Sequence, residues 1–304
     1  MHLPYGCAIM IKKEGKPDMK IMKHYQGNET LRHSFQELAQ ATFGLDFENW
    51  YQMVFWGDDY VPYSVIEDDR VVANVSLNRT DMIISGQRKR LYQLGTVMTA
   101  ERYRNRGYIR AIMEEIEKDI QDADGVYLFA NDSVLEFYPK FGFASEKEFV
   151  YTKTLSQSGP CRMENIPMDI SENQAKLCQA IEENALPAAC RMIGNPGLIF
   201  FYVVQFMRDC VYYDRILDAW AIGQLEDGEL VLHNVFSARD ISLEGVLQAF
   251  GSGVKSVILG FTPSDTEGFT CRELKEENCT FFVKGEAFRD FAKKKLRIPS
   301  LSHA

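Results

Sequence analysis

Four arginines crowd around one glycine in the stretch RYRNRGYIRAIMEEIEKDI, residues 102–120. Apolar residues recur there every three or four positions, which predicts a helix with one packed face. The preceding RLYQLGTVMT is typical of a strand that ends at Thr99. A strand, a short loop and a helix start near Asn105 would gather free backbone N–H groups at the positive end of the helix dipole. The pattern therefore predicts an anion site, to which Arg104, Arg106 and Arg110 add charge and Gly107 allows close approach.

The alternative is that these arginines are simply solvated. Positive charges in the first turn oppose the helix dipole, at a cost of a few tenths of a kcal/mol each. Several such charges in one loop favour an anionic ligand that compensates them. Phosphate is an anion that such a helix start binds.

The run LGTVMTAERYRNRGYIRAIM resembles the coenzyme A signature of the GNAT acetyltransferase superfamily, in which a strand edge is followed by R/Q-x-x-G-x-G/A at a helix start. Arg104, Asn105, Arg106, Gly107, Tyr108 and Ile109 occupy that pattern. Ile109 departs from it, because the last position is usually glycine or alanine. The form R-x-R-G-Y-x-R-A-x-M is similar to the Eis-type variant, where a bulky residue there is common.

A second segment, LFANDSVLEFYPKFGF (residues 128–143), resembles the strand and F-Y-x-x-x-G-F element that closes the coenzyme site in this superfamily. The resemblance implies that Tyr138 donates a proton to the departing thiolate and that Asn131 helps to hold the pantetheine arm. Taken alone, the same aromatic residues are also explained as core side chains. The two segments together, about thirty residues apart, identify the chain as a GNAT-like acetyltransferase.

The resemblance also implies a mechanism. Acetyl-CoA is the cofactor, Val97, Met98 and Thr99 form the strand edge that pairs with pantetheine, and the pyrophosphate lies on the amides of residues 105–109. A backbone N–H near Met98 polarises the acetyl carbonyl. The general base stays open, because RLYQLGTVMT contains no carboxylate. The candidates are Glu67, Asp68, Asp58, Asp59 and the C-terminal carboxylate of Ala304.

The resemblance implies that the segment FENWYQMVFWGDDYVPYS lines one side of the acceptor-binding pocket. Trp50 and Trp56 would supply flat apolar surface, and Asp58 and Asp59 negative charge. This combination suits a small cationic primary amine. Core aromatics and surface acids explain the same residues equally well.

The order of elements predicts an α/β (α+β) GNAT fold, a mixed and mostly antiparallel sheet flanked by helices. Helices are expected over NETLRHSFQELAQATF, capped at Asn28 or Thr30, over FENWYQMVFW, and from Asp132 or Ser133 onwards. SQSGP, residues 156–160, is the clearest linker, which predicts a catalytic domain over 1–157 and a second domain over 161–304. The second half repeats strand, strand, helix, strand with a hairpin at EDG, yet ARDI stands where the arginine loop would be. We therefore expect a degenerate GNAT-like domain without a coenzyme site.

Composition limits the partners. The net charge of −9 is spread over both halves, so neither is the basic domain of a nucleic-acid binder. No apolar run has the length of a membrane helix. The seven cysteines show neither C-x-x-C pairs nor zinc-ligand spacing, which favours reduced thiols in a cytoplasmic protein and no metal site. A small-molecule amine acceptor is expected, and a homo-oligomer stays open. A coenzyme A-binding sensor that has lost its chemistry is the competing function.

Overall fold

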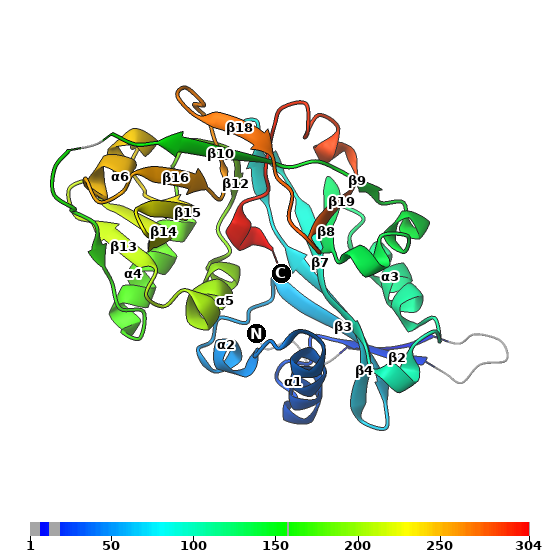
Figure 1. Ribbon diagram of the computed structural model, residues 1–304. Coiled ribbons are helices and arrows are strands. Elements are labelled where there is room, and N and C mark those ends of the chain that lie inside the picture. The colour runs from blue at the N-terminus through cyan, green and yellow to red at the C-terminus, as the bar shows by residue number, and fades with distance from the viewer. Residues whose placement is uncertain (1–6, 12–18, 157, 304) are drawn as a thin grey trace. The chain divides into compact units, whose positions relative to one another are not determined.

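The computed structural model of the chain, shown in Figure 1, describes residues 7–11, 19–156 and 158–303. Its contacts divide the chain into two compact units. The first consists of Met1–Arg79, Tyr92–Ala123 and Ala304, and the second of Thr80–Leu91 and Asp124–His303. This division does not fall at the SQSGP segment where the sequence suggested a boundary.

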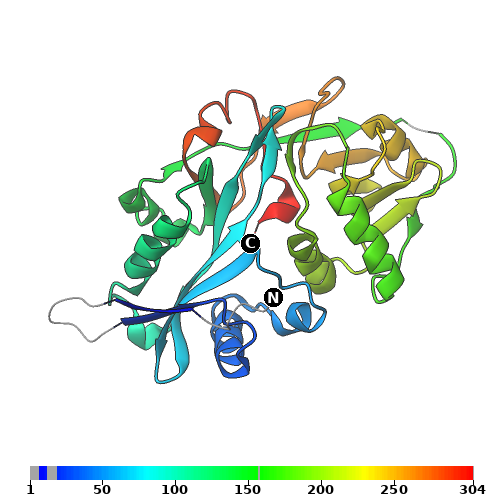
Figure 2. The same cartoon turned by 180° about the vertical axis from the view of Figure 1, so that it is seen from behind.

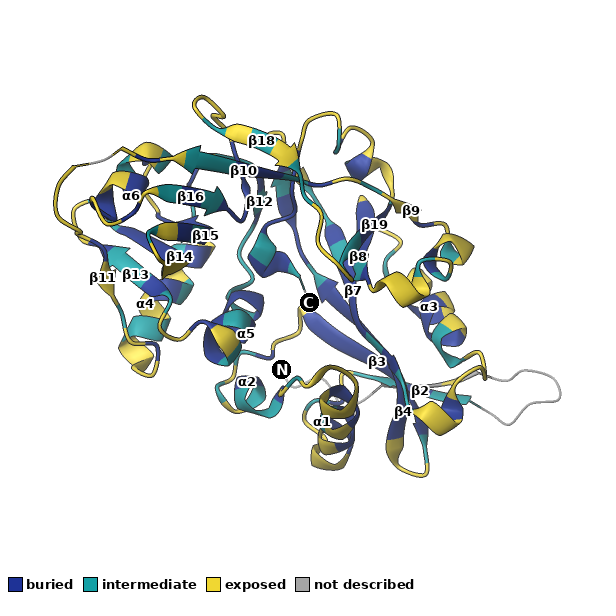
Figure 3. Cartoon of the chain, viewed as in Figure 1, coloured by how far each residue is buried: buried dark blue, intermediate teal, exposed yellow. Residues whose placement is uncertain are grey.

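The first unit is built on an antiparallel sheet with helices against it. Its strands lie in the order β1 (Cys7–Ile11), β2 (Met19–Lys23), β3 (Tyr60–Glu67), β4 (Arg70–Arg79) and β7 (Leu91–Thr99). Helices α1 (Glu29–Phe43) and α3 (Tyr108–Asp119) both contact β4, which is buried along almost its whole length (Figure 3). Because neighbouring residues of a strand point to opposite faces, β4 is covered on both faces.

Helix α1 forms as its sequence predicts. The Asn28 side chain accepts a hydrogen bond from the Leu31 N–H, and Gly44 ends the helix in the left-handed conformation. Leu31, Phe35 and the rest of the expected face are buried. The next helix is shorter than expected, because α2 covers only Glu48–Gln52.

The second unit contains three sets of strands. In the first, β19 (Thr280–Lys284) lies between β8 (Gly125–Ala130) and β9 (Ala144–Ser145). The second has the order β11 (Glu164–Asn165), β13 (Val211–Asp214), β14 (Ala219–Glu226), β15 (Glu229–Phe236), β16 (Ser256–Leu259), β10 (Phe149–Thr154) and β18 (Thr270–Glu273). The third has the order β17 (Thr262–Pro263), β12 (Ala188–Met192), β5 (Met82–Ile84) and β6 (Gln87–Lys89).

The helices of this unit are α4 (Ser171–Glu182), α5 (Pro196–Phe206) and α6 (Leu243–Ala249). In the view from behind, α4 stands in front of β14, against which it packs (Figure 2). The expected hairpin is confirmed, because β14 and β15 pair through a turn at Asp227 and Gly228, both with positive φ. Strands β15 and β16 run parallel and are joined through α6, so the repeated strand, strand, helix, strand order is present.

Two strands are exchanged between the halves of the sequence. Strand β10 comes from the first half, yet it lies between β16 and β18 of the second half. Strand β19 comes from the second half, yet it pairs with β8 and β9 of the first. Strands from before and after the SQSGP linker therefore pair within the same sheets. This pairing explains why the boundary between the compact units does not fall at the linker.

Two other local expectations differ from the structure. The segment from Asp132 forms two turns of 3-10 helix, Asp132–Val134 and Tyr138–Phe141, instead of one α-helix. Pro139, the second residue of the latter turn, lacks the N–H that a continuous helix would use. The apolar helix α5 was not expected, because it is apolar on all sides and carries no amphipathic period.

Among the residues that the structure describes, no helix is both long and apolar enough to cross a membrane. Six cysteines, Cys161, Cys178, Cys190, Cys210, Cys271 and Cys279, are free thiols, and the side chain of Cys7 is outside the described part.

Candidate active site

The arginine loop follows β7 and leads into α3. One turn of 3-10 helix, Glu101–Tyr103, comes first, and α3 begins at Tyr108, three residues later than expected. Asn105 and Gly107 have φ of 62° and 80°, so the chain turns twice through the left-handed region. Asparagine and glycine are the residues that adopt this region most readily. The loop conformation thus fixes where the helix starts.

Gly107 is the N-cap of α3, and no side chain caps the helix there. The first amides of a helix have no partner within it, so those of Tyr108 and Ile109 point out of the helix end. A Cβ built on Gly107 would meet no heavy atom within 4 Å. The space around the Gly107 Cα is open, so the glycine is needed for its backbone angle and not for lack of room.

The charge of this loop is exposed and uncompensated. Arg102 and Arg106 lie over the Tyr103 ring, at 4.7 and 4.8 Å from its centroid, and Arg106 also donates to the Arg102 carbonyl. Within the described residues neither of them, nor Arg104, forms an ion pair. Three cations within five residues and a set of free amides fit a pyrophosphate.

Tyr108 connects this loop to the neighbouring strand. Its hydroxyl donates a hydrogen bond to Glu67 at the end of β3. Burial, together with this carboxylate, raises the pKa of Tyr108 above the ordinary value. Glu67, one of the suggested general bases, therefore accepts a hydrogen bond from Tyr108 and holds the loop. Asp68 follows it in the exposed turn before β4, and Ala304 lies outside the described residues.

Strand β7 is bulged just before the predicted pantetheine edge. Asn74 of β4 pairs with Met98, whereas Ser76 pairs with Gly95, so two residues of β7 oppose one of β4. Thr96 in this bulge has φ of 48°, a conformation that a β-branched residue rarely adopts. Such a residue costs on the order of 1–3 kcal/mol and persists only where its surroundings hold it.

Residues 97–99 alternate between the two faces of β7. Met98 is buried at 2% exposure, while Val97 and Thr99 are half-buried and point to the other face. The sequence did not reveal what holds the bulge. The signal was present, however, because Asn74, Ser76 and Asn78 place a polar side chain at every second position of a strand that is otherwise apolar.

Tyr138 lies in the second unit, at the start of the turn Tyr138–Phe141. It is 5% exposed and packs against Phe137, Phe143 and Phe282 with ring centroids 5.3, 6.3 and 5.8 Å away. Its hydroxyl has no hydrogen-bond partner among the described residues. Burial raises the pKa of Tyr138 to about 12, so the phenol carries its proton at neutral pH. Asn131, at the end of β8, is exposed.

The four predicted acceptor residues divide into two pairs. Trp50 and Trp56 are 2% and 5% exposed and stack on each other at 5.6 Å within an aromatic core that includes Phe47. So little exposed ring surface leaves nothing for a ligand to stack on, and these side chains are core aromatics. Asp58 and Asp59 are exposed in the turn before β3 and remain the negative charges of this segment.

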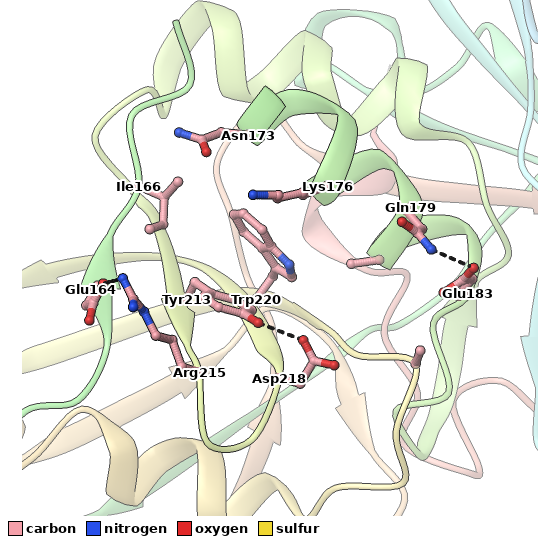
Figure 4. A pocket seen from close by; sticks show the side chains of 12 residues that line it. Glu164, Ile166, Asn173, Lys176, Gln179, Glu183, Tyr213, Arg215, Asp218 and Trp220 are labelled. Carbon is pink, nitrogen blue, oxygen red and sulfur yellow. Dashed lines mark hydrogen bonds and ion pairs between the residues drawn. The ribbon is translucent and has the colours of Figure 1, made fainter. Parts of the chain in front are cut away.

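A cavity of about 680 Å³ lies elsewhere, in the second unit (Figure 4). It is lined by β11, α4, β13 and β14, and Trp220 lies at its centre near Tyr213 and Lys176. Both of its cations form ion pairs, Arg215 with Glu164 and Lys176 with Glu172. None of the residues predicted to bind coenzyme or acceptor lines it. Across the described residues, no three His, Cys, Asp or Glu side chains gather as metal ligands would.

A comparison with protein families identifies the domain that contains the arginine loop. The model of the acetyltransferase (GNAT) domain matches residues 26–145. This part of the chain is a GNAT acetyltransferase domain. The match includes both the arginine loop and Tyr138, and a GNAT domain supports an acyltransferase that uses acetyl-CoA.

Solved structures extend the likeness over nearly the whole chain, at the level of the fold. A conserved protein of Enterococcus faecalis V583, described as a probable N-acyltransferase, is 16% identical and matches 92% of this chain and 72% of its own with a TM-score of 0.58. Eis1 of Mycobacterium abscessus is 12% identical, with 96% and 76% covered and a TM-score of 0.52. A GCN5-related N-acetyltransferase of Kribbella flavida is 16% identical, with 84% and 70% covered and a TM-score of 0.51. The predicted GNAT fold, in an arrangement like that of Eis, is confirmed. The comparison with curated proteins found no significant match.

Proposed function

We propose that the chain is an N-acetyltransferase that moves the acetyl group of acetyl-CoA directly to a primary amine of a small cationic acceptor. The observation that carries this proposal is the arginine loop, where uncompensated cations and free helix amides occur together within a GNAT domain. The amides of residues 105–109 would hold the pyrophosphate, with Arg104, Arg106 and Arg110 around it. Val97, Met98 and Thr99 would pair with the pantetheine arm, and Asn131 would help to hold it.

The chemistry assigned to Tyr138 is proton donation. The neutral amine attacks the thioester carbonyl carbon, the tetrahedral intermediate expels the thiolate of coenzyme A, and that sulfur takes the Tyr138 proton. The amine loses its own proton to solvent or to an exposed carboxylate. The burial that raises the pKa of Tyr138 to about 12 supports this role, because the acid is then protonated whenever the amine is neutral.

The acceptor remains defined by charge. Asp58 and Asp59 are exposed, and the chain as a whole carries a net charge of −9, so a cationic amine is attracted and a polyanion is repelled. The proposed assignment covers a catalytic domain over residues 1–157 and a second domain over 161–304 that lacks a phosphate loop. Six free thiols support a reducing, cytoplasmic location.

Thiol release from acetyl-CoA, measured over a panel of polyamines, aminoglycosides and lysine peptides, tests the proposal. We expect Tyr138→Phe to lower kcat about a hundredfold to ten-thousandfold with unchanged affinity for coenzyme A. Tyr151→Phe is the matched control, because it also removes the hydroxyl of a tyrosine buried in the second unit and should leave kcat unchanged. Equal turnover by Tyr138→Phe and wild type would remove the assigned acid. Coenzyme binding without turnover over the whole panel would support the sensor instead.

A further inference from the structure

The strained residue of β7 is held by a chain of buried polar side chains. Asn74, in the middle of β4, donates from its Nδ2 to the Thr96 carbonyl and to Ser76 Oγ, both at 2.9 Å. Asn74 and Ser76 have no exposed surface, and Thr96 has 9%. Tyr60 reaches the same residue from β3, with its hydroxyl 2.6 Å from Thr96 Oγ1. Thr96 is thus fixed through both its carbonyl and its side chain.

The direction of these hydrogen bonds can be assigned without ambiguity. The Thr96 carbonyl can only accept, so the Asn74 group that faces it is the amide nitrogen. Its oxygen then accepts from Ser64 Oγ at 2.8 Å. Ser64 has only one hydroxyl proton, so the Tyr25 hydroxyl, 2.6 Å away, donates to Ser64. The chain therefore runs one way, from Tyr25 through Ser64 and Asn74 to the bulge, across strands that lie side by side in Figure 1.

This arrangement has a consequence for the next residue. The carbonyl of Thr96 and the N–H of Val97 belong to one peptide group, which is trans as everywhere in the described chain. In a trans peptide the two groups point in opposite directions. Because Asn74 on β4 holds the carbonyl, the Val97 N–H points away from β4. Neither Thr96 nor Val97 has a partner in the register between the two strands.

We propose that Asn74 is a positioning residue that aims the Val97 N–H at the acetyl carbonyl of the donor. The proposal rests on the proposed function, because it assumes that the edge at residues 97–99 binds acetyl-CoA. It assigns a purpose to the Thr96 strain, since a relaxed peptide would not be held in this orientation. A fixed donor stabilises the negative charge that develops on the carbonyl oxygen without reorganising during the reaction.

The test is the carbonyl stretch of 13C-acetyl-labelled acetyl-CoA bound to the protein, measured by isotope-edited infrared spectroscopy together with kcat. Asn74→Asp keeps the side-chain shape but has no proton for the Thr96 carbonyl. Asn74→Ser is the uncharged second variant, and its side chain is too short to reach. For both we expect the stretch to return towards its value in water and kcat to fall about tenfold to a hundredfold. Affinity for coenzyme A without the acetyl group should change less than about threefold, because it does not use this amide.

Ser34→Ala is the matched control. It removes a buried hydroxyl of the first unit, which accepts from the Val71 N–H at 2.9 Å and has no part in the chain from Tyr25 to Thr96. We expect its carbonyl stretch to equal that of wild type and its kcat to change less than about threefold. The positioning role is refuted if the stretch is the same in wild type and in both Asn74 variants, or if Ser34→Ala shifts it as much as they do. A shifted stretch in wild type without turnover on any amine would instead refute the proposed function and leave the positioning role standing.

Discussion

The substitution Gly107→Ala tests the proposed pyrophosphate-binding loop, because it changes only the backbone conformations that residue 107 can adopt. Gly107 has φ of 80°, and a Cβ there would contact nothing within 4 Å, so the substitution adds strain without a steric clash. An L-residue pays roughly 1–2 kcal/mol for the left-handed conformation. The exposed loop of free protein can relax to avoid this cost, whereas the bound loop cannot. We therefore expect Gly107→Ala to weaken coenzyme A binding about five- to thirtyfold, measured by isothermal titration calorimetry.

Control substitutions at two other glycines separate a loss of coenzyme binding from a general loss of stability. Gly44 has φ of 71° and equally open space, but it ends α1, so Gly44→Ala should lower the unfolding free energy by about 1–2 kcal/mol and leave the affinity unchanged. Gly57 has an ordinary φ and open space, so Gly57→Ala should change neither quantity. Wild-type affinity in Gly107→Ala would contradict the reasoning, as would an equal loss of affinity in Gly44→Ala.

Three further outcomes are expected. The pH profile of kcat should show no loss of the acid up to about pH 10, because burial raises the pKa of Tyr138 to about 12; a fall near pH 8 would contradict the assignment. Burial also raises the pKa of Glu148 from 4.5 to about 7, so the folded state binds this proton more tightly than the unfolded state does. The contribution of this proton to the free energy of unfolding is fully present below pH 4.5 and is lost as the pH rises through 7. Glu148→Gln should therefore remove this pH dependence and raise the unfolding free energy at pH 8 by at most about 3 kcal/mol in urea titrations, and an unchanged profile would refute it. A fragment of residues 1–157 lacks β19, the partner of both β8 and β9, so it should show no cooperative unfolding by circular dichroism; a folded fragment would contradict the importance of the strand exchange.

Local signals in the sequence were enough to predict the arginine loop and most of the helices and strands. The cap at Asn28, the apolar face of α1 and the hairpin at Asp227 and Gly228 depend on nearest neighbours along the chain, and each is found as expected. The strand, loop and helix around Gly107 are equally local, although the left-handed Asn105 and Gly107 move the helix start to Tyr108.

Contacts between distant segments were beyond local signals. Strands β10 and β19 have the residue composition of strands. Their sequences do not indicate, however, that each pairs with strands from the other half of the sequence. The burial of Trp50 and Trp56 likewise depends on Phe35, Phe47 and Tyr60, which close around them only in the folded unit. Thr96 was missed because its strain is imposed by Asn74 from another strand.

Mass spectrometry of the acceptor panel after incubation with 13C-acetyl-CoA tests the central claim most directly. We expect one cationic amine to gain one labelled acetyl group, at a rate that Tyr138→Phe lowers about a hundredfold or more while Tyr151→Phe matches wild type. Tight coenzyme A binding with no labelled acceptor anywhere in the panel would contradict the claim that this chain transfers acetyl groups.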